Sequence, residues 1–160
     1  MLDSPVTSAP VRIAGPGDEN KIFEAGLLMH AETALYSLSE QKIREGIRLG
    51  TQRKGGIIGI IDAPDGSIAA MIGLIITSAW YTTDIHLEDF WTFVRRDYRR
   101  SGAANMLVHF SIKMSDELGI PLQLGVTSID RLEAKTRLMR RKMKQIGALF
   151  AHNLNIGKVS

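Results

Sequence analysis

Two runs rich in β-branched residues in the middle of the chain constrain the fold more than any other feature. The first is Ile57-Ile58-Gly59-Ile60-Ile61, and the second extends from Ile68 to Thr77. Branching at Cβ restricts the side-chain rotamers and favours the extended backbone of a strand. Between the runs, Asp62-Ala63-Pro64-Asp65-Gly66 combines residues that are typical of tight turns. The pattern predicts two antiparallel strands joined as a hairpin.

The segments on either side of the hairpin alternate between helical and extended patterns. Apolar spacing, caps and turn residues predict, in chain order, a strand at 11–13, a helix at 19–32, a helix from the N-cap Ser39 to Gly50, the hairpin, a strand at 86–94, a helix from Gly102 to Leu118 with Gly119 as C-cap, a strand at 121–126, a helix at 131–146 and a strand at 148–153. A strand meander followed by strand–helix–strand crossovers implies a mixed sheet with helices on both faces. The predicted class is α/β, in its α+β form.

The length of 160 residues suits one domain. Residues 1–10 contain two prolines and several small polar residues, so we expect a flexible N-terminal arm followed by a single domain at 11–160. The N-terminus lacks the basic and apolar stretches of a signal peptide. The longest uncharged run, Gly66 to Tyr81, is shorter than the roughly 20 apolar residues of a membrane-spanning helix. We expect a cytoplasmic protein with no membrane partner.

Composition removes several kinds of chemistry. The chain has no cysteine, which excludes thiol nucleophiles, disulfides and cysteine-ligated zinc. Its 4 histidines are scattered without metal-ligand spacing, so no metal is expected. The formal net charge of +3 permits an anionic ligand without requiring one, and the location of the positive charge therefore matters more than its sum.

The segment from Phe93 to Ala104 carries the strongest functional signal. It leaves a strand, passes through Arg95-Arg96-Asp97-Tyr98-Arg99-Arg100, and enters a helix at Gly102. Backbone N–H groups at a helix start have no partner within the helix and carry the positive end of its dipole. The small residues Ser101, Gly102, Ala103 and Ala104 let an anion approach them closely. The turn is suited to a phosphate or pyrophosphate.

Arg99-x-x-Gly102-x-Ala104 resembles the Arg/Gln-x-x-Gly-x-Gly/Ala signature of the GNAT superfamily of N-acetyltransferases. Val94 and Tyr98-Arg99 match the V-x-P-x-Y-R segment that leads into this signature in the family, except that Arg96 replaces the usual proline. The resemblance implies a mixed, mostly antiparallel sheet of six to seven strands and acetyl-CoA as co-substrate. It also implies that Arg99 and the N–H groups from Arg100 through Ser101, Gly102 and Ala103 to Ala104 hold the pyrophosphate, and that Phe93 and Val94 pair with the pantetheine arm.

The resemblance implies direct acetyl transfer to an amine, for which a carboxylate can accept the ammonium proton. Counting back from Arg99 without gaps places Glu88 at the position of the base, with Asp89 or His86 as the next candidates. Strict alternation puts Glu88 on the face of Phe90, Thr92 and Val94, and Asp89 on that of Trp91 and Phe93. The alternative is that all three polar side chains merely solvate a strand end.

Two other parts of the expected site are less regular. Met139, or Met143 in a second register, stands where the family carries a tyrosine that protonates the thiolate. Methionine cannot donate a proton, which leaves Tyr98, Ser128 or a water as substitutes. The part of the site that binds the acetyl-accepting amine is expected at 30–39, where Glu32 and Tyr36 can contact an amine on a small molecule or a peptide.

Seven basic residues lie between Arg131 and Lys144, against the single acid Glu133. They can form a solvated helix face, contact the 3′-phosphate side of CoA, or bind an acidic partner. The segment has no aromatic residues between its basic ones, so its sequence does not favour nucleic acid as the partner. The segment also resembles small phage- or prophage-encoded GNAT proteins, and a homodimer is consistent with the family. The alternatives to an active enzyme are a CoA-binding protein with little activity and a basic interaction module for nucleic acid or protein.

Overall fold

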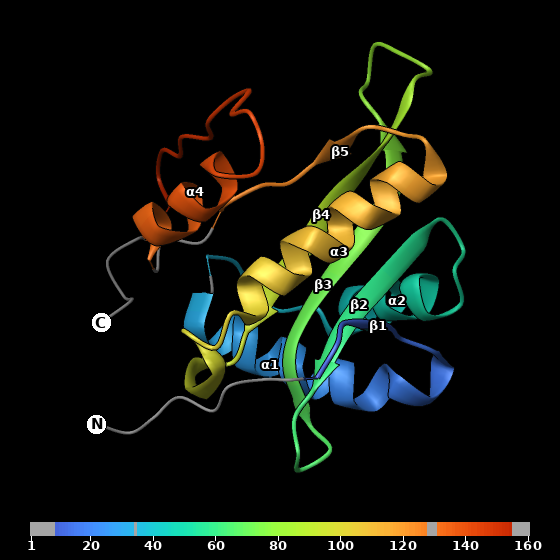
Figure 1. Cartoon of the computed structure of the whole chain (residues 1–160), viewed down its shortest axis with the longest axis vertical. Coiled ribbons are helices and arrows are strands. Elements are labelled where there is room, and N and C mark those ends of the chain that lie inside the picture. The colour runs from blue at the N-terminus through green and yellow to red at the C-terminus, as the bar shows by residue number, and fades with distance from the viewer. Residues whose placement is uncertain (1–8, 34, 128–130, 155–160) are drawn as a thin grey trace.

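The computed structural model describes residues 9–33, 35–127 and 131–154, and its centre is a twisted sheet (Figure 1). The five strands lie in the order β1-β2-β3-β4-β5, and each neighbouring pair is antiparallel except β4 and β5, which are parallel. Their bounds are Arg12–Ile13 for β1, Gly56–Asp62 for β2, Ile68–Ser78 for β3, Ile85–Val94 for β4 and Leu122–Gln123 for β5. The predicted hairpin is thus confirmed as β2 and β3.

Helices cover both faces of the sheet, as predicted (Figure 1). The helices are α1 (Glu19–Thr33), α2 (Glu40–Thr51), α3 (Ala103–Leu118) and the short α4 (Leu132–Arg140), with single 3-10 turns at Pro16–Asp18 and Arg96–Tyr98. The predicted caps are present. Ser39 Oγ accepts the N–H of Lys42 at 3.4 Å, and Gly119 ends α3 with a φ of +67°.

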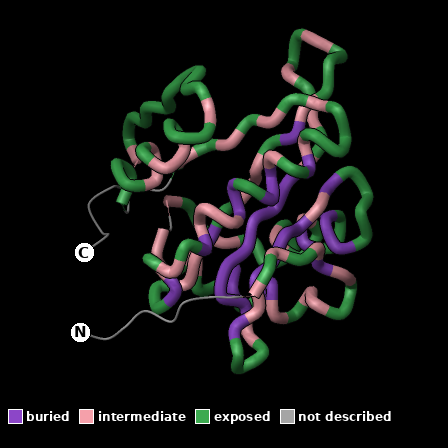
Figure 2. Tube along the Cα trace, viewed as in Figure 1, coloured by how far each residue is buried: buried purple, intermediate pink, exposed green. Residues whose placement is uncertain are grey.

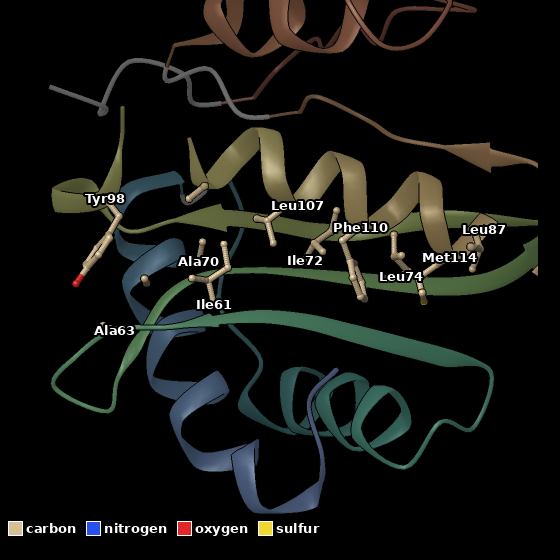
Figure 3. Packing of buried hydrophobic residues seen from close by; sticks show 12 residues of the cluster. Ile61, Ala63, Ala70, Ile72, Leu74, Leu87, Tyr98, Leu107, Phe110 and Met114 are labelled. Atoms are coloured by element: carbon tan, nitrogen blue, oxygen red, sulfur yellow. The ribbon is translucent and has the colours of Figure 1, made fainter. Parts of the chain in front are cut away.

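Two apolar cores hold these layers together. The first lies between the sheet and α3, where Ile72 and Leu74 contact the side of the helix that carries Leu107 and Phe110 (Figure 3). The second lies between the opposite face and the helices α1 and α2, and includes Ile22, Ile47, Ile58, Ile60 and Met71. Burial is concentrated in the central strands (Figure 2). The end of β4 and the start of α3 are therefore packed into these cores through Phe93 and Ala103.

The C-terminal quarter differs from the sequence-based expectation. The described residues form five strands rather than six to seven, because 148–153 form no strand and the strand predicted at 121–126 is only the two residues of β5. The helix predicted at 131–146 ends at Arg140. None of its residues is buried, and a helix without a packed apolar face loses its main source of stability. Residues 1–8 lie outside the description, so the division into an arm and a domain stays a prediction.

Candidate functional site

A β-bulge interrupts β4 beside the turn that leads into α3. Gly73 of β3 lies opposite Trp91, whereas the next residue, Leu74, lies opposite Asp89, so that Phe90 is an extra residue on β4. Gly73 accommodates the extra ring. A Cβ atom on this glycine would lie 2.7 Å from Phe90 Cε1 and 2.9 Å from Trp91 Cε2, which is closer than real contacts allow. The bulge therefore turns both aromatic side chains to the face covered by α2, where they also approach Gly46.

The bulge corrects the predicted alternation along β4. Asp89 lies opposite Leu74, a residue of the core under α3, and Thr92 Oγ1 donates to Asp89 Oδ2 at 3.0 Å. Asp89 therefore shares a face with Thr92 rather than with Trp91 and Phe93. Phe93, like Trp91, packs in the core under α1 and α2. Strict alternation fails because the extra residue shifts every later side chain by one position.

Glu88 and its neighbours offer unused polar groups on the α1/α2 face. The Glu88 side chain is 51% exposed and lies opposite Ile75, with Oε2 at 3.5 Å from His86 Nε2. His86 Nε2 and Trp91 Nε1 are both buried and have no hydrogen-bond partner in the described part of the chain. Buried polar atoms normally find partners, so this edge of the bulge is suited to a polar ligand.

Asp89 faces the other way and joins β4 to the chain beyond β5. Its Oδ1 accepts the N–H of Gly125 at 2.6 Å, in addition to the bond from Thr92. Burial raises the pKa of Asp89, and the hydrogen bonds from Gly125 and Thr92 only partly oppose this rise. Asp89 thus has both oxygens engaged in hydrogen bonds, whereas the carboxylate of Glu88 is half-exposed and, within the described residues, has only the 3.5 Å contact with His86 Nε2.

We expect Asp89→Asn to raise the melting temperature at pH 7 by a few degrees and to give no gain at pH 3. A carboxyl whose folded-state pKa is raised loses stability as the pH rises from its unfolded-state pKa through its folded-state pKa, and asparagine avoids this loss. The amide oxygen can still accept the Gly125 N–H. Thermal melts at both pH values test this. Asp97→Asn serves as the opposite control, because Arg95 lowers the pKa of Asp97 and removing that charge costs stability at pH 7. A lower melting temperature for Asp89→Asn at pH 7 contradicts the expectation.

The strands β4 and β5 separate after a short contact. Only Leu87 with Leu122 and Glu88 with Gln123 are paired, and beyond them the Asp89–Gly125 bond spans the gap between the strands. The last residues of β4 therefore have backbone groups directed away from β3 that no strand of the described chain pairs. Val94 is half-buried at the end of this stretch, next to the turn.

The turn after Val94 presents a group of unpaired N–H donors. Arg100 and Gly102 have φ values of +80° and +85°, a conformation that costs energy for arginine. Ser101 Oγ donates to Tyr98 O at 2.6 Å and accepts the Ala103 N–H at 3.3 Å. Within the described chain, the N–H groups of Arg100, Gly102, Ala104 and Asn105 have no acceptor. Such a row of N–H groups at a helix start has the geometry that suits an anion.

The arginines of the turn divide into two kinds. Arg99 forms an ion pair with Glu32 of α1, and its Nε donates to Val94 O at 3.2 Å. Arg95 contacts Asp97 and lies over the Tyr98 ring, whereas Arg96 and Arg100 are exposed. The pair between Arg99 and Glu32 links α1 to the turn. The sequence did not predict this ion pair, because the two residues are 67 positions apart. The helical pattern around Glu32 and the turn motif around Arg99 each carry no information about the other.

The remaining predicted residues are spread over the molecule. Tyr36 lies exposed between α1 and α2, with its carbonyl 2.9 Å from His30 Nε2, and Tyr98 is buried in the core under α3. Met139 on α4 and Met143 after it are half-buried, and α4 lies to one side of the sheet (Figure 1). Ser128 lies outside the described residues. Among the described residues, no three histidine, aspartate or glutamate side chains are grouped as a metal site requires, and no helix is long and apolar enough to cross a bilayer.

Solved structures identify the architecture. A predicted acetyltransferase with acetyl-CoA from Clostridium acetobutylicum aligns over 89% of this chain and 94% of its own, with a TM-score of 0.70 and 10% identity. A ribosomal-protein-alanine N-acetyltransferase from Brucella melitensis aligns over 91% of this chain and 98% of its own, with a TM-score of 0.69 and 13% identity. A GNAT family acetyltransferase from Staphylococcus aureus aligns over 92% of this chain and 100% of its own, with a TM-score of 0.63 and 12% identity.

The chain has the GNAT acetyltransferase fold. No family model and no curated protein sequence matches it, so the likeness is one of structure. The GNAT fold confirms the expectation drawn from Arg99-x-x-Gly102-x-Ala104. The comparisons give no support to the phage resemblance of the basic segment.

Proposed function

We propose that this protein is an acetyl-CoA-dependent N-acetyltransferase that acts directly on an amine. The observation that carries the proposal is the row of unpaired N–H groups at the start of α3, directly after the open end of β4. The fold adds support, since a solved structure with the same architecture contains acetyl-CoA.

The proposed roles at the turn follow from the geometry. The N–H groups of Arg100, Gly102 and Ala104 would hold the pyrophosphate, and exposed Arg100 adds charge at its edge. Ser101 and Ala103 shape the turn, because their polar groups already bond within it. Phe93 and Val94 would offer backbone groups to the pantetheine arm, with Arg99 fixing the Val94 carbonyl. Acetyl-CoA held by these residues would supply the acetyl thioester for the transfer.

The amine is proposed to approach from the α1/α2 face. Glu88 would take the proton that the nitrogen loses as the new C–N bond forms and the C–S bond breaks. His86 Nε2 and Trp91 Nε1, which make no hydrogen bond within the described residues, can orient the acceptor. Glu32 is held by Arg99, so on this side Tyr36 is the more accessible of the two acceptor residues named from the sequence. The acceptor is proposed to be a small-molecule or peptide amine.

A second candidate is a CoA-binding protein with little activity. Met139 and Met143 favour it, because neither can protonate the thiolate where the family carries tyrosine. In the enzyme, a water would have to serve instead.

Two measurements on the wild-type chain separate these possibilities. Acetyl-CoA should raise the melting temperature in either case, because a ligand that binds only the folded state stabilises it. Release of free CoA is then followed with a panel of aminoglycosides, polyamines, amino acids and peptide N-termini. Release that depends on one amine class supports the enzyme. A thermal shift with no release across the panel supports the CoA-binding protein, and no shift at millimolar acetyl-CoA overturns both.

A further inference from the structure

The loop that joins β3 to β4, residues 79–84, carries two adjacent aromatic side chains in solvent. Trp80 is 96% exposed and Tyr81 is 74% exposed, and the loop projects beyond the helices at the top of the molecule (Figure 1). Tryptophan is highly buried on average, because its large ring loses more than most side chains when it stays in water. Two such rings side by side on a projecting loop therefore indicate a binding surface.

Hydrogen bonds within the β3–β4 loop fix the backbone that carries the rings. The Thr82 N–H donates to the Ala79 carbonyl at 3.2 Å, so that the two aromatic residues are the central residues of a tight turn. Thr82 Oγ1 accepts the N–H of Asp84 at 3.0 Å. The rings of Trp80 and Tyr81 meet edge to face, with centroids 5.6 Å apart and planes at 83°. Two nearly perpendicular rings on an ordered turn form two walls of an aromatic cage.

The sequence around the loop is electronegative. No lysine or arginine occurs from Gly55 to Val94, whereas Asp84, Glu88 and Asp89 lie within this stretch, at the loop and in the first half of β4. The side chains of Asp84 and Glu88 are exposed. The face of an aromatic ring carries the negative part of its quadrupole, so the rings and the carboxylates attract the same kind of ligand, which is a cation.

The basic turn before β2 lies on the other side of the hairpin. Its Gly55 carbonyl accepts the N–H of Ile76 of β3 at 2.9 Å. Arg53 and Lys54 therefore lie beside β3, whereas the exposed acids belong to β4 and to the loop before it. An anionic partner such as a membrane surface or a nucleic acid fits the β4 side less well than a cation does.

The strand that leaves the loop also carries the proposed base. Ser78 and Ile85 form the last pair of the ladder before the loop, and Glu88 follows three residues after Ile85. At about 3.3 Å per residue, Glu88 lies roughly 10 Å along β4 from the start of the loop. A ligand that reaches both the base and the rings must be elongated, and a free amino acid is too short.

We propose that Trp80 and Tyr81 form a cation-binding subsite, which holds a second ammonium or guanidinium group of an elongated polycationic acceptor while its reacting amine lies at Glu88. The inference rests on the proposed function, because it extends the site of amine acetylation along β4. It selects among the amines: a polyamine or a peptide with several basic side chains contacts both places, whereas a monoamine gains nothing from the rings. Asp84 adds charge attraction at the edge of the cage.

Calorimetric titration of the chain without acetyl-CoA tests the subsite directly. We expect spermine and a tetralysine peptide to bind, and the double variant Trp80→Leu/Tyr81→Leu to weaken this binding by about tenfold, which corresponds to two exposed cation–π contacts. Leucine keeps the apolar bulk without a ring face, so Trp80→Phe/Tyr81→Phe should lose less. Both rings are exposed, so these changes should leave the fold intact, and far-UV circular dichroism checks this.

A matched pair of carboxylate variants tests the charge. Asp84→Asn should weaken the binding of spermine, whereas Glu24→Gln, which removes an exposed carboxylate of α1, should leave it unchanged. Equal binding in Asp84→Asn and wild type removes the carboxylate from the subsite and contradicts the proposal.

Release of CoA gives the kinetic readout. The leucine double variant should raise the KM of the polycation and leave kcat unchanged, because the rings contact a group remote from the reacting nitrogen. The KM of n-butylamine should stay at its wild-type value. A loss with either polycation supports the subsite, and the larger of the two losses identifies the source of the cation.

Several results would overturn the proposal. These are a wild-type affinity for spermine no greater than for n-butylamine, equal affinities in wild type and the leucine double variant, or an equal loss for spermine and n-butylamine, which would report an apolar contact. Retention of wild type on phosphatidylserine vesicles that the double variant loses would assign the rings to a membrane instead. If no amine releases CoA, the proposed function fails, and the titration still decides the subsite.

Discussion

Acetyl-CoA is expected to raise the melting temperature of the wild-type chain and of Ala104→Asn, and to leave that of Ala104→Asp unchanged. The N–H of Ala104 is one of the unpaired donors at the start of α3. A carboxylate there repels the pyrophosphate, and like charges brought together cost several kcal/mol, which corresponds to a loss of about 100-fold or more in affinity. The same carboxylate is compatible with folding, because a negative charge in the first turn of a helix stabilises it.

The size of the shift can be estimated. A ligand at about 100 times its dissociation constant stabilises the folded state by roughly 2.7 kcal/mol. For a domain of this size that is a rise of about 5–10 °C. Asparagine has the shape of aspartate without its charge, so Ala104→Asn controls for bulk. Equal shifts in all three proteins, measured by differential scanning fluorimetry, would place the cofactor elsewhere.

Glu88→Gln is expected to lower kcat by about 100-fold or more while leaving the acetyl-CoA thermal shift intact. Removing a general base costs roughly 10²–10⁴ in rate. Glutamine keeps the shape of the side chain, and the unpaired N–H groups of the turn lie on a different segment, so binding should survive. The measurement is steady-state release of CoA with the amine that the panel identifies.

Two further variants make this result decisive. Glu24→Gln removes an exposed carboxylate of α1 that lies in no predicted site and should keep the wild-type rate. Asp89→Asn tests the other carboxylate at the bulge. A rate for Glu88→Gln equal to wild type removes it as the base, and a much larger loss in Asp89→Asn would move that role to Asp89.

The elements of this fold were predictable because their signals are local. Four isoleucines in five positions and a Pro-Asp-Gly turn specify the β2–β3 hairpin through backbone and rotamer preferences alone. Ser39 and Gly119 mark helix ends through bonds and dihedral angles within a few residues. The turn from Arg99 to Ala104 is equally local, and the structure places its small residues at the start of α3.

The features that sequence reasoning missed depend on how distant segments meet. The bulge at Phe90 requires the space left by Gly73, which belongs to another strand. The ion pair between Glu32 and Arg99 depends on how α1 packs beneath the turn. Residues 148–153 have the composition of a strand, but a strand also needs an edge to pair with, and composition does not say whose.

The extra residue in β4 also affects how the chain is compared with distant proteins. Before Phe90 the odd-numbered residues of β4 face α3, whereas after it the even-numbered residues do. An alignment that runs through β4 without a gap therefore assigns residues to the correct face of the sheet on only one side of Phe90. A role transferred from a protein whose strand lacks this residue would be assigned to the wrong face. Deleting Phe90 would restore regular alternation along β4 while leaving Glu88 on the side of Phe93 and Asp89 on the side of Thr92.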